Sequence, residues 1–337
     1  MRELPLASRN KTIRLDDAEV DDLSRMLAVD LADAFRKGDA IACLDFCEHL
    51  VDVPDNSIDL IVVDPPYNLS KVYGDMAFRK ISADSYEQWL ERWMPALVRG
   101  LKPSGSMYVC GDWESSSEIH RVLRRHVKVR SRITWERDKG RGALRNWKNN
   151  TEDVWFCTRG DSYTFNLDAV KVKKRVIAPY RDAQGLAKDW AEEDGQNVRW
   201  TAPSNVWTDI TVPFWSMAEN TEHPTQKPEK LIAKLVLASS NPGDLVFDPF
   251  LGSGTTAVVA RKLKRRFVGC EIDRTYCCLA LRRLQMARDN PAIQGFDGVF
   301  FHERNAAEAQ LANRTRASVS IDELSLTPLI PAALHRT

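Results

Sequence analysis

Hydrophobic residues recur along the chain with two different periods, and the two periods alternate. Side chains that return every three or four positions predict amphipathic helices. These segments are 16–36, 85–101, 115–126, 230–238 and 256–262. Short apolar runs rich in branched side chains predict strands. These runs are 58–63, 106–110, 127–135, 244–247 and 267–272. The run at 58–63 has five apolar residues among six, as in a strand buried on both faces of a parallel sheet.

The alternation stops at about residue 161 and resumes after residue 222. The intervening residues 161–222 contain basic residues, four tryptophans and three prolines but no sustained period, which predicts an inserted recognition region rather than sheet. Because strands and helices alternate on both sides of it, we predict an α/β fold with one doubly wound, mixed sheet built from 37–160 and 223–304. Residues 1–36 form a predicted N-terminal helical arm, and the tail 305–337 has no strong pattern.

The composition excludes several classes of protein. With 43% hydrophobic and 28% charged residues, the chain resembles an ordinary globular protein. Its apolar runs are far shorter than the roughly 20 residues that cross a bilayer, and its first ten residues lack a signal-peptide core, so we expect a cytoplasmic protein. The seven cysteines form no CxxC pair, so we expect neither a metal site nor a disulfide framework.

Charge is distributed unevenly along a chain whose net charge is only +1. Residues 119–176 carry sixteen Lys and Arg against six Asp and Glu, with Trp135, Trp147 and Trp155 between them, which favours a nucleic-acid partner. The alternative is a solvated surface that acids elsewhere in the fold neutralise. The candidate DNA-binding residues in and beside this stretch are Arg137, Lys139, Arg141, Arg145, Lys173, Lys174 and Arg175.

The first motif with chemical content is a glycine loop between two predicted strands. One strand ends at Asp248, the loop Gly252-Ser253-Gly254 turns the chain, and a helix begins near Thr255. The next strand ends at Glu271, where nucleotide-binding α/β folds place the acid that binds a ribose. No Gly-Lys-Ser/Thr follows, so the loop is not a triphosphate-binding loop. Asp248 would repel a pyrophosphate but suits a cofactor with an amino group, such as S-adenosylmethionine. The alternative is a turn that only packs helix on strand.

The second motif is Asp64-Pro65-Pro66-Tyr67, directly after the buried strand at 58–63. Open α/β sheets bind ligands at the carboxyl ends of their strands. The Asp64 carboxylate and the Pro65 carbonyl could accept both hydrogens of an amino group on a planar base and turn its lone pair outward. Proline leaves no N–H to compete. Tyr67 could stack on the base, at roughly 1–3 kcal/mol. The alternative is a surface Pro-Pro turn.

These motifs resemble those of the DNA amino-methyltransferases, in particular the beta group of adenine-N6 enzymes of type II restriction-modification systems. The resemblance covers about 38–286. It rests on four segments in the family's order, Gly38-Asp39-Ala40, Asp64-Pro65-Pro66-Tyr67, His223-Pro224-Thr225-Gln226-Lys227-Pro228 and Phe250-Leu251-Gly252-Ser253-Gly254-Thr255-Thr256. The tetrapeptide precedes the cofactor loop, which implies a circularly permuted, Rossmann-like methyltransferase fold with the target-recognition region between the two motifs.

The resemblance also implies roles for individual residues. The ribose of S-adenosylmethionine would bind Glu271, and its adenine would lie near Asp39, Ala40 and Ile272. The methionine end would lie near the cofactor-binding residues Asp248, Phe250, Leu251, Gly252, Ser253, Gly254, Thr255, His223, Pro224, Thr225 and Lys227. A target adenine flipped out of duplex DNA would bind Asp64, Pro65, Pro66 and Tyr67. Methylation would protect the site from a restriction endonuclease without a stable complex, and the sequence leaves a homodimer through 23–35 open.

Three other functions stay open on the sequence alone. Cytosine N4 could be methylated by the same geometry, although that group of enzymes more often has Ser where Asp64 stands. An RNA or a protein amide is a further substrate class, and protein-amide enzymes tend to have Asn at this position. A DNA-binding protein that has kept the fold without catalysis belongs to a different class, against which the complete motifs argue.

Overall fold

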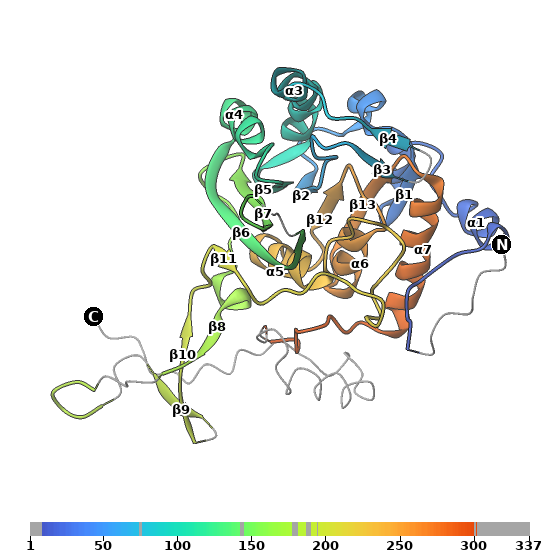
Figure 1. Ribbon diagram of the computed structural model, residues 1–337. Coiled ribbons are helices and arrows are strands. Elements are labelled where there is room, and N and C mark those ends of the chain that lie inside the picture. The colour runs from blue at the N-terminus through green and yellow to red at the C-terminus, as the bar shows by residue number, and fades with distance from the viewer. Residues whose placement is uncertain are drawn as a thin grey trace.

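A computed structural model of the chain describes residues 9–73, 76–141, 145–176, 181–186, 190–193, 195–299 and 301. Its centre is an eight-stranded sheet in the order β1-β13-β12-β2-β5-β7-β6-β11 (Figure 1). The strands are β1 Ala40–Cys43, β2 Ile58–Val63, β5 Leu101–Gly111, β6 Lys128–Arg141, β7 Asn149–Thr158, β11 Val206–Trp207, β12 Leu245–Asp248 and β13 Arg266–Glu271. The first five strands in this order are parallel, and β7 is antiparallel to both β5 and β6. The sheet confirms the predicted mixed, permuted architecture.

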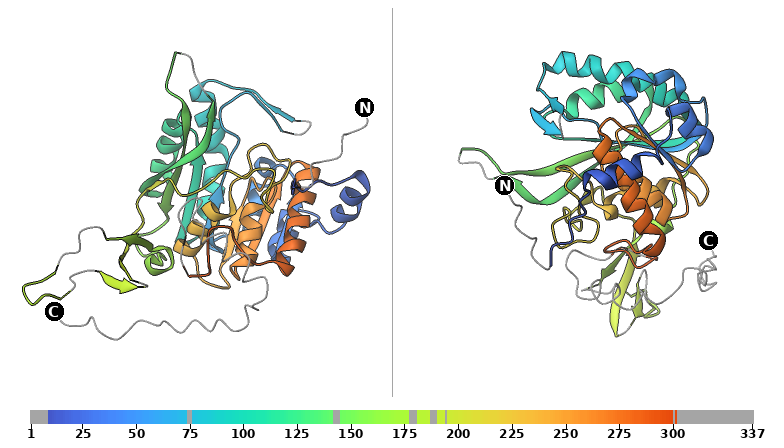
Figure 2. Two further views of the ribbon diagram at one scale, coloured as in Figure 1. Left: turned by 60° about the horizontal axis from the view of Figure 1, so that its bottom comes forward. Right: turned by 90° about the vertical axis from the view of Figure 1, so that its right-hand side faces the viewer.

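Helices cover both faces of this sheet (Figures 1 and 2). On one face lie α3 and α4, and on the other lie α5, α6 and α7. Their bounds are α3 Ala83–Gly100, α4 Ser116–His126, α5 Glu229–Ser239, α6 Thr255–Lys262 and α7 Arg274–Asp289. In β2, Leu60 and Val62 pack toward α5, whereas Ile61 and Val63 pack toward α3. All four are at most 1% exposed, which explains why the sequence of this strand is almost entirely apolar.

The two halves of the chain meet where β2 pairs with β12. The parallel register places Val246 opposite Leu60 and Phe247 opposite Ile61. The carboxyl ends of the two strands therefore lie side by side, although they are far apart in sequence. Two 3-10 turns, Phe46–Glu48 and Leu50–Asp52, connect β1 to β2, and the short hairpin of β3 Lys71–Tyr73 and β4 Met76–Phe78 follows β2.

The N-terminal region differs from the single helix predicted over 16–36. It forms α1 Asp17–Ser24 and α2 Leu31–Lys37, each capped by the aspartate that precedes it. The chain is extended between them, where Ala28 donates its N–H to the carbonyl of Ile41 and lengthens the edge of the sheet. Leu23 and Leu31 are buried within the chain, so much of the apolar face is used in its own core rather than in an arm.

The inserted region also differs from the prediction, because it does contain a sheet. Strands β8 Val172–Arg175, β10 Gln196–Thr201 and β9 Ala191–Glu193 form a small antiparallel sheet, called the recognition arm below, that projects from the body (Figure 1). Its strands are short and rich in charged residues, so their sequences lack the alternation that signals a strand. A 3-10 turn, Leu167–Val170, precedes the arm, and β11 then joins β6 at the edge of the main sheet.

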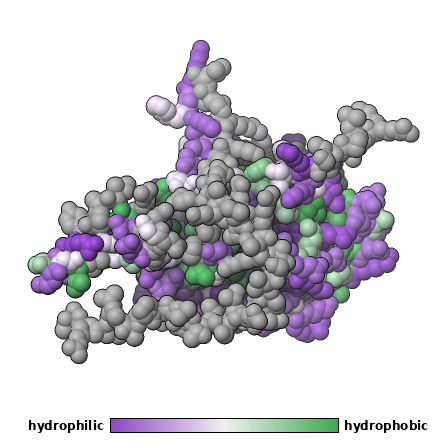
Figure 3. Space-filling view, turned by 90° about the horizontal axis from the view of Figure 1, so that it is seen from below, coloured by the Kyte–Doolittle hydropathy of each residue, from purple (hydrophilic) through white to green (hydrophobic). Residues whose placement is uncertain are grey.

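The surface and the helices carry two further observations. On the underside in Figure 3, the described residues are mainly hydrophilic, and the hydrophobic ones form small separate patches. None of the described helices combines the length and the apolar character that a membrane crossing requires. The predicted tail 305–337 lies outside the described residues.

Gly254 in the glycine loop after β12 and Gly243 before β12 provide a matched test of loop packing. Both have a left-handed backbone, with φ of +85° and +87°. A Cβ on Gly254 would lie 2.4 Å from the Cβ of Ala280 in α7, whereas nothing lies within 4 Å of a Cβ on Gly243. We expect both alanine variants to lose about 1–2 kcal/mol through backbone strain and Gly254→Ala to lose about 1–3 kcal/mol more through overpacking. Urea denaturation measures both, and equal losses would contradict the tight packing of the loop against α7.

Candidate active site

Three of the four sequence motifs, at 64–67, 223–228 and 250–256, converge on one cavity of about 400 Å³ at the carboxyl ends of β1, β2, β12 and β13. Parallel strands end at the same edge of a sheet, which is why residues from distant segments meet there. The predicted site residues that line the cavity are Asp64, Pro65, Pro66, Tyr67, His223, Thr225, Lys227, Asp248, Phe250, Leu251, Gly252, Ser253, Thr255, Glu271 and Ile272. Of the predicted catalytic and cofactor-binding residues, Asp39, Ala40, Pro224 and Gly254 are not in its lining.

Glu271 and Asp248 form the acidic part of the cavity. Glu271 ends β13 and accepts hydrogen bonds from the N–H groups of Gly252 at 2.8 Å and Asp273 at 2.9 Å. Asp248 ends β12 and accepts hydrogen bonds from the Phe250 N–H at 3.0 Å and the Thr256 hydroxyl at 2.6 Å. Burial raises the pKa of Glu271, and it raises the pKa of Asp248 to about 7. The hydrogen bonds that hold both carboxyl groups come from neutral donors, so this part of the cavity favours a positively charged ligand.

The Asp64 carboxylate belongs to a cluster of charged and polar residues from four segments of the chain. The Lys227 ammonium lies 2.6 Å from Asp64 Oδ2 and 3.5 Å from Glu152 Oε2. The Tyr67 hydroxyl lies 3.1 Å from Asp64 Oδ1 and 3.1 Å from Glu152 Oε2. Arg137 Nη1 in β6 donates to Glu152 Oε1 at 2.9 Å. The Lys227 ammonium thus pairs with the tetrapeptide 64–67, and its role at the amino-acid end of the cofactor stays a prediction.

Burial and charge set the proton affinities in this cluster. Burial raises the pKa of Asp64, an effect that the Lys227 ammonium opposes. Burial alone would lower the pKa of Lys227, but the Asp64 and Glu152 carboxylates raise it above its ordinary value. Burial raises the pKa of Tyr67 far above 10, and the two carboxylates raise it further. Lys227 is therefore a cation and Tyr67 a hydrogen-bond donor at neutral pH.

The structure corrects the segment assigned to the cofactor adenine. Asp39 lies at the amino end of β1, where its carboxylate accepts the Phe267 N–H at 3.0 Å, and Ala40 pairs with Val268. This is the opposite end of the strand from the cavity. The loop after the carboxyl end of β1 reaches the cavity instead, with Leu44, Asp45, Phe46 and Cys47 in its lining. Asp45 comes two residues after the short strand β1, and a carboxylate so close to the carboxyl end of a strand is a signal that could have identified it.

The basic stretch divides into two parts. In α4, Arg121 pairs with Glu87 at 2.8 Å and Arg125 pairs with Glu91 at 2.7 Å, both carboxylates belonging to α3. The alternative interpretation, a basic surface neutralised by distant acids, therefore holds for this helix. Arg137 also pairs with an acid, Glu152, which contacts Tyr67.

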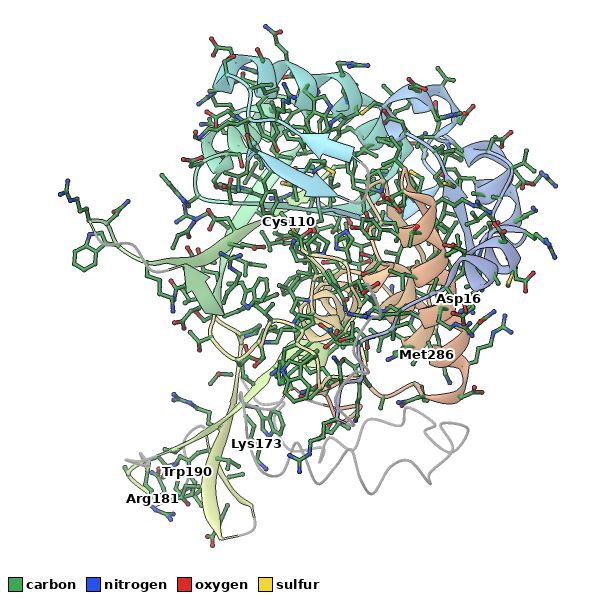
Figure 4. The ribbon with its side chains drawn as sticks, turned by 45° about the vertical axis from the view of Figure 1, so that its right-hand side comes forward. Asp16, Cys110, Lys173, Arg181, Trp190 and Met286 are labelled. Atoms are coloured by element: carbon green, nitrogen blue, oxygen red, sulfur yellow. The ribbon has the colours of Figure 1, made fainter. Side chains whose placement is uncertain are left out.

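The other predicted DNA-binding residues lie on two projections. At the end of the β6–β7 hairpin, Arg145 is exposed beside Trp147, which is 93% exposed. In the recognition arm, the Lys173 ammonium lies 5.9 Å from the ring centre of Trp200. Arg181 and Trp190 lie together farther from the body (Figure 4). Lys139 and Arg141 lie in β6, and Lys174 and Arg175 lie in β8, but their side chains are outside the described part of the structure.

Comparisons with known proteins agree with this arrangement. The N6/N4 methyltransferase family model, described as DNA methylase, matches residues 58–282. The chain is 34% identical over 262 residues to the Type II methyltransferase M.HpaI of Haemophilus parainfluenzae, covering 77% of this chain and 76% of that protein. It is 36% identical over 253 residues to the DNA adenine methyltransferase YhdJ of Escherichia coli (strain K12), covering 74% and 82%. The solved PvuII DNA methyltransferase (cytosine-N4-specific) has a TM-score of 0.53 at 20% identity, covering 72% and 85%, and shows the same fold.

Removing Lys227 tests the charge balance of the cluster. Lys227→Met leaves Asp64 and Glu152 buried without their shared cation, and we expect the free energy of unfolding to fall by about 3 kcal/mol at pH 8. Without Lys227 the folded-state pKa of Asp64 rises further above its unfolded value. The loss is therefore largest above that pKa and shrinks as the pH falls toward 5, where the folded protein takes up a proton. Urea denaturation at both pH values measures it.

Two further variants make this test specific. Lys80→Met removes an exposed ion pair with Glu114 and should cost less than about 1 kcal/mol at either pH. Asp64→Asn added to Lys227→Met removes one of the unpaired charges and should restore part of the stability. A loss that is the same at pH 8 and pH 5, or that Asp64→Asn does not reduce, would contradict this account of the charged cluster.

Proposed function

The chain belongs to the N6/N4 DNA methyltransferase family, and from this premise we propose that it methylates the N6 amino group of adenine in duplex DNA. The family uses S-adenosylmethionine as its cofactor, and the substrate is DNA. The observation that carries the proposal is the position of Asp64. Its carboxylate lies in the same cavity as Asp248 and Glu271, so a base at Asp64 and a cofactor at the two acids would be neighbours.

The residues of the cavity fit S-adenosylmethionine. Glu271 would bind the ribose hydroxyls, and the acidic environment of Asp248 would attract the amino end. Among the described residues, the buried Ser253 hydroxyl in the cavity has no hydrogen-bond partner, as expected of a group that awaits a ligand. The loop at Leu44 and Asp45, rather than Asp39 and Ala40, would contact the adenine together with Ile272. When bound, the cofactor supplies a methyl group activated by a sulfonium.

The chain's own residues then position the target base. The Asp64 carboxylate and the Pro65 carbonyl would accept the two hydrogens of the N6 amino group, so that its lone pair faces the methyl group. Tyr67 would stack on the base. An adenine inside a duplex cannot reach this edge of the sheet, so it must be flipped out. Alignment of the amino nitrogen with the methyl group would account for a large part of the rate enhancement of methyl transfer. No covalent nucleophile is needed.

Adenine is favoured over cytosine by Asp64 at the first position of the tetrapeptide and by the adenine specificity in the name of YhdJ. Target recognition would fall to the recognition arm and the β6–β7 hairpin, within the proposed region 161–222 and just before it. The sequence also resembles the RsrI adenine methylase, which implies GAATTC as the target and protection from a cognate restriction endonuclease as the role.

Identification of the methylated base tests this function. We expect the protein to transfer label from tritiated S-adenosylmethionine to plasmid DNA and the label to appear in N6-methyladenine after digestion to nucleosides. Asp64→Ala should reduce transfer by about a thousandfold or more, because it removes the acceptor for the amino group. Its dissociation constant for the cofactor should change less than about threefold, because the ribose and amino-end residues are intact. Sequencing that locates the methylated bases identifies the target.

The alternative outcomes separate the remaining functions. Asp161→Ala, which removes an exposed carboxylate paired with Arg130 in β6, serves as the control and should leave transfer unchanged. Label in N4-methylcytosine would keep the mechanism but overturn the base. Binding of the cofactor and of DNA without transfer would establish the non-catalytic DNA-binding protein.

Proton release on cofactor binding tests the role of Asp248. Its pKa of about 7 in the free protein reflects burial, and a bound cation should lower it. Binding near pH 6.5 should therefore release roughly half a proton or more, and affinity should weaken as the pH falls below 7. Calorimetry in two buffers of different ionisation enthalpy measures the release, which Asp248→Asn should largely remove. Equal heats in both buffers for the unmodified protein would show that no cation binds beside Asp248.

A further inference from the structure

The Tyr67 hydroxyl faces two carboxylates but has only one proton to donate. Asp64 Oδ1 and Glu152 Oε2 lie at the same distance from it, 3.1 Å. Because the pKa of Tyr67 is raised, the hydroxyl keeps this proton and can bond to either acceptor. The Tyr67 hydroxyl can therefore donate to Asp64 or to Glu152 in nearly equivalent hydrogen bonds. If Asp64 is no longer free to accept, Glu152 still is.

The target amino group must donate to an oxygen of the Asp64 carboxylate, and both of these oxygens already accept a hydrogen bond. Oδ2 is bonded to the Lys227 ammonium at 2.6 Å, a charge-assisted hydrogen bond and the stronger of the two contacts. Oδ1 receives only the neutral Tyr67 hydroxyl. An incoming amino group therefore displaces Tyr67 from Oδ1 more readily than it displaces Lys227 from Oδ2.

We propose that Glu152 is a positioning residue that holds the Tyr67 hydroxyl when the target amino group takes its place on Asp64. The inference rests on the proposed function and deepens it. Glu152 does not touch the base. It acts through Tyr67, because a hydroxyl that keeps a partner also keeps the ring in the orientation that stacks on the base. Without Glu152, binding of the amino group would strand a buried hydroxyl, which is costly.

The surroundings of Glu152 fit this role. Its other oxygen, Oε1, is fixed by Arg137 at 2.9 Å, so Oε2 stays directed at Tyr67. The side chain is 9% exposed, and Lys227 at 3.5 Å offsets its charge. Glu152 also sits near the start of β7, opposite Trp135 in β6, so the pairing of two long strands fixes its backbone. A carboxylate held this firmly is suited to keep another side chain in place.

A double-mutant cycle in single-turnover methylation tests the proposal, because it shows whether Glu152 acts through the Tyr67 hydroxyl. The four proteins are the unmodified chain, Glu152→Ala, Tyr67→Phe and the double variant, each with saturating cofactor and DNA. We expect Glu152→Ala to slow transfer about 10- to 100-fold in the presence of Tyr67. In the Tyr67→Phe background, which has no hydroxyl to hold, the same change should slow transfer less than about threefold.

The split between rate and binding separates positioning from other roles of Glu152. The dissociation constants of the Glu152→Ala protein for cofactor and for DNA should stay within about twofold of the original. Glu91→Ala, which removes a carboxylate from the ion pair between α3 and α4, is the control and should leave the transfer rate unchanged. If Glu152→Ala does not fold, Glu152→Gln goes through the same cycle, with an expected slowing of about three- to tenfold because a neutral acceptor is weaker.

Each outcome has a defined meaning. Coupling between Glu152 and the Tyr67 hydroxyl, with unchanged binding, supports the inference. Independent effects of the two substitutions, or a loss that lies entirely in DNA affinity, overturn it and leave the proposed function intact. Absence of transfer by the unmodified protein on any DNA overturns the proposed function and this inference together. Transfer to cytosine N4 overturns only the choice of base, and the cycle then applies to that amino group.

Discussion

The parallel pairing of β2 with β12 is the constraint on which the site depends. This pairing sets Phe247 opposite Ile61, so Asp64, which follows β2, and Asp248, which ends β12, come to the same edge of the sheet. One of them belongs to the tetrapeptide proposed to hold the base and the other to the loop proposed to hold the cofactor. A shift in the register of this pair would move the two acids apart and turn their side chains to the wrong faces. The helices on both faces fix the register by burying every apolar residue of β2.

The same convergence brings several carboxyl groups together in a buried site. Basic side chains neutralise some of these carboxylates but not others. Lys227 and Arg137 offset Asp64 and Glu152, so the part of the cavity assigned to the base is close to neutral. Asp248 and Glu271 are held by neutral donors instead. Their raised pKa values show that the negative charge there is costly without a ligand. A cationic cofactor would relieve this cost, whereas a polyphosphate would increase it.

The sheet and most of the cavity could be predicted from the sequence, because apolar strands and the motifs at their carboxyl ends are local signals. Two parts could not. The first is the adenine segment, which the resemblance assigns to Asp39 and Ala40, and only the pairing of β1 with β13 shows that these residues lie at the amino end of the strand, away from the cavity. Glu152 lies near the start of its strand. Because β7 is antiparallel to β5, its first residues reach the edge where the parallel strands end, and only the pairing of Asp153 with Gly111 reveals this.

The distribution of charge along the sequence does not match its distribution on the surface. Glu87 and Glu91 in α3 neutralise part of the basic stretch 119–176. What remains lies on the recognition arm and on the β6–β7 hairpin, and the hairpin has a second property. Its strands pair near Arg137 and Glu152 and again at Arg141 and Asn149, and the exposed Trp147 and Arg145 lie between the two strands in sequence. A contact with DNA at Trp147 or Arg145 would act on the same two strands that fix the position of Glu152. Recognition of the duplex and orientation of Tyr67 would then share one structural element.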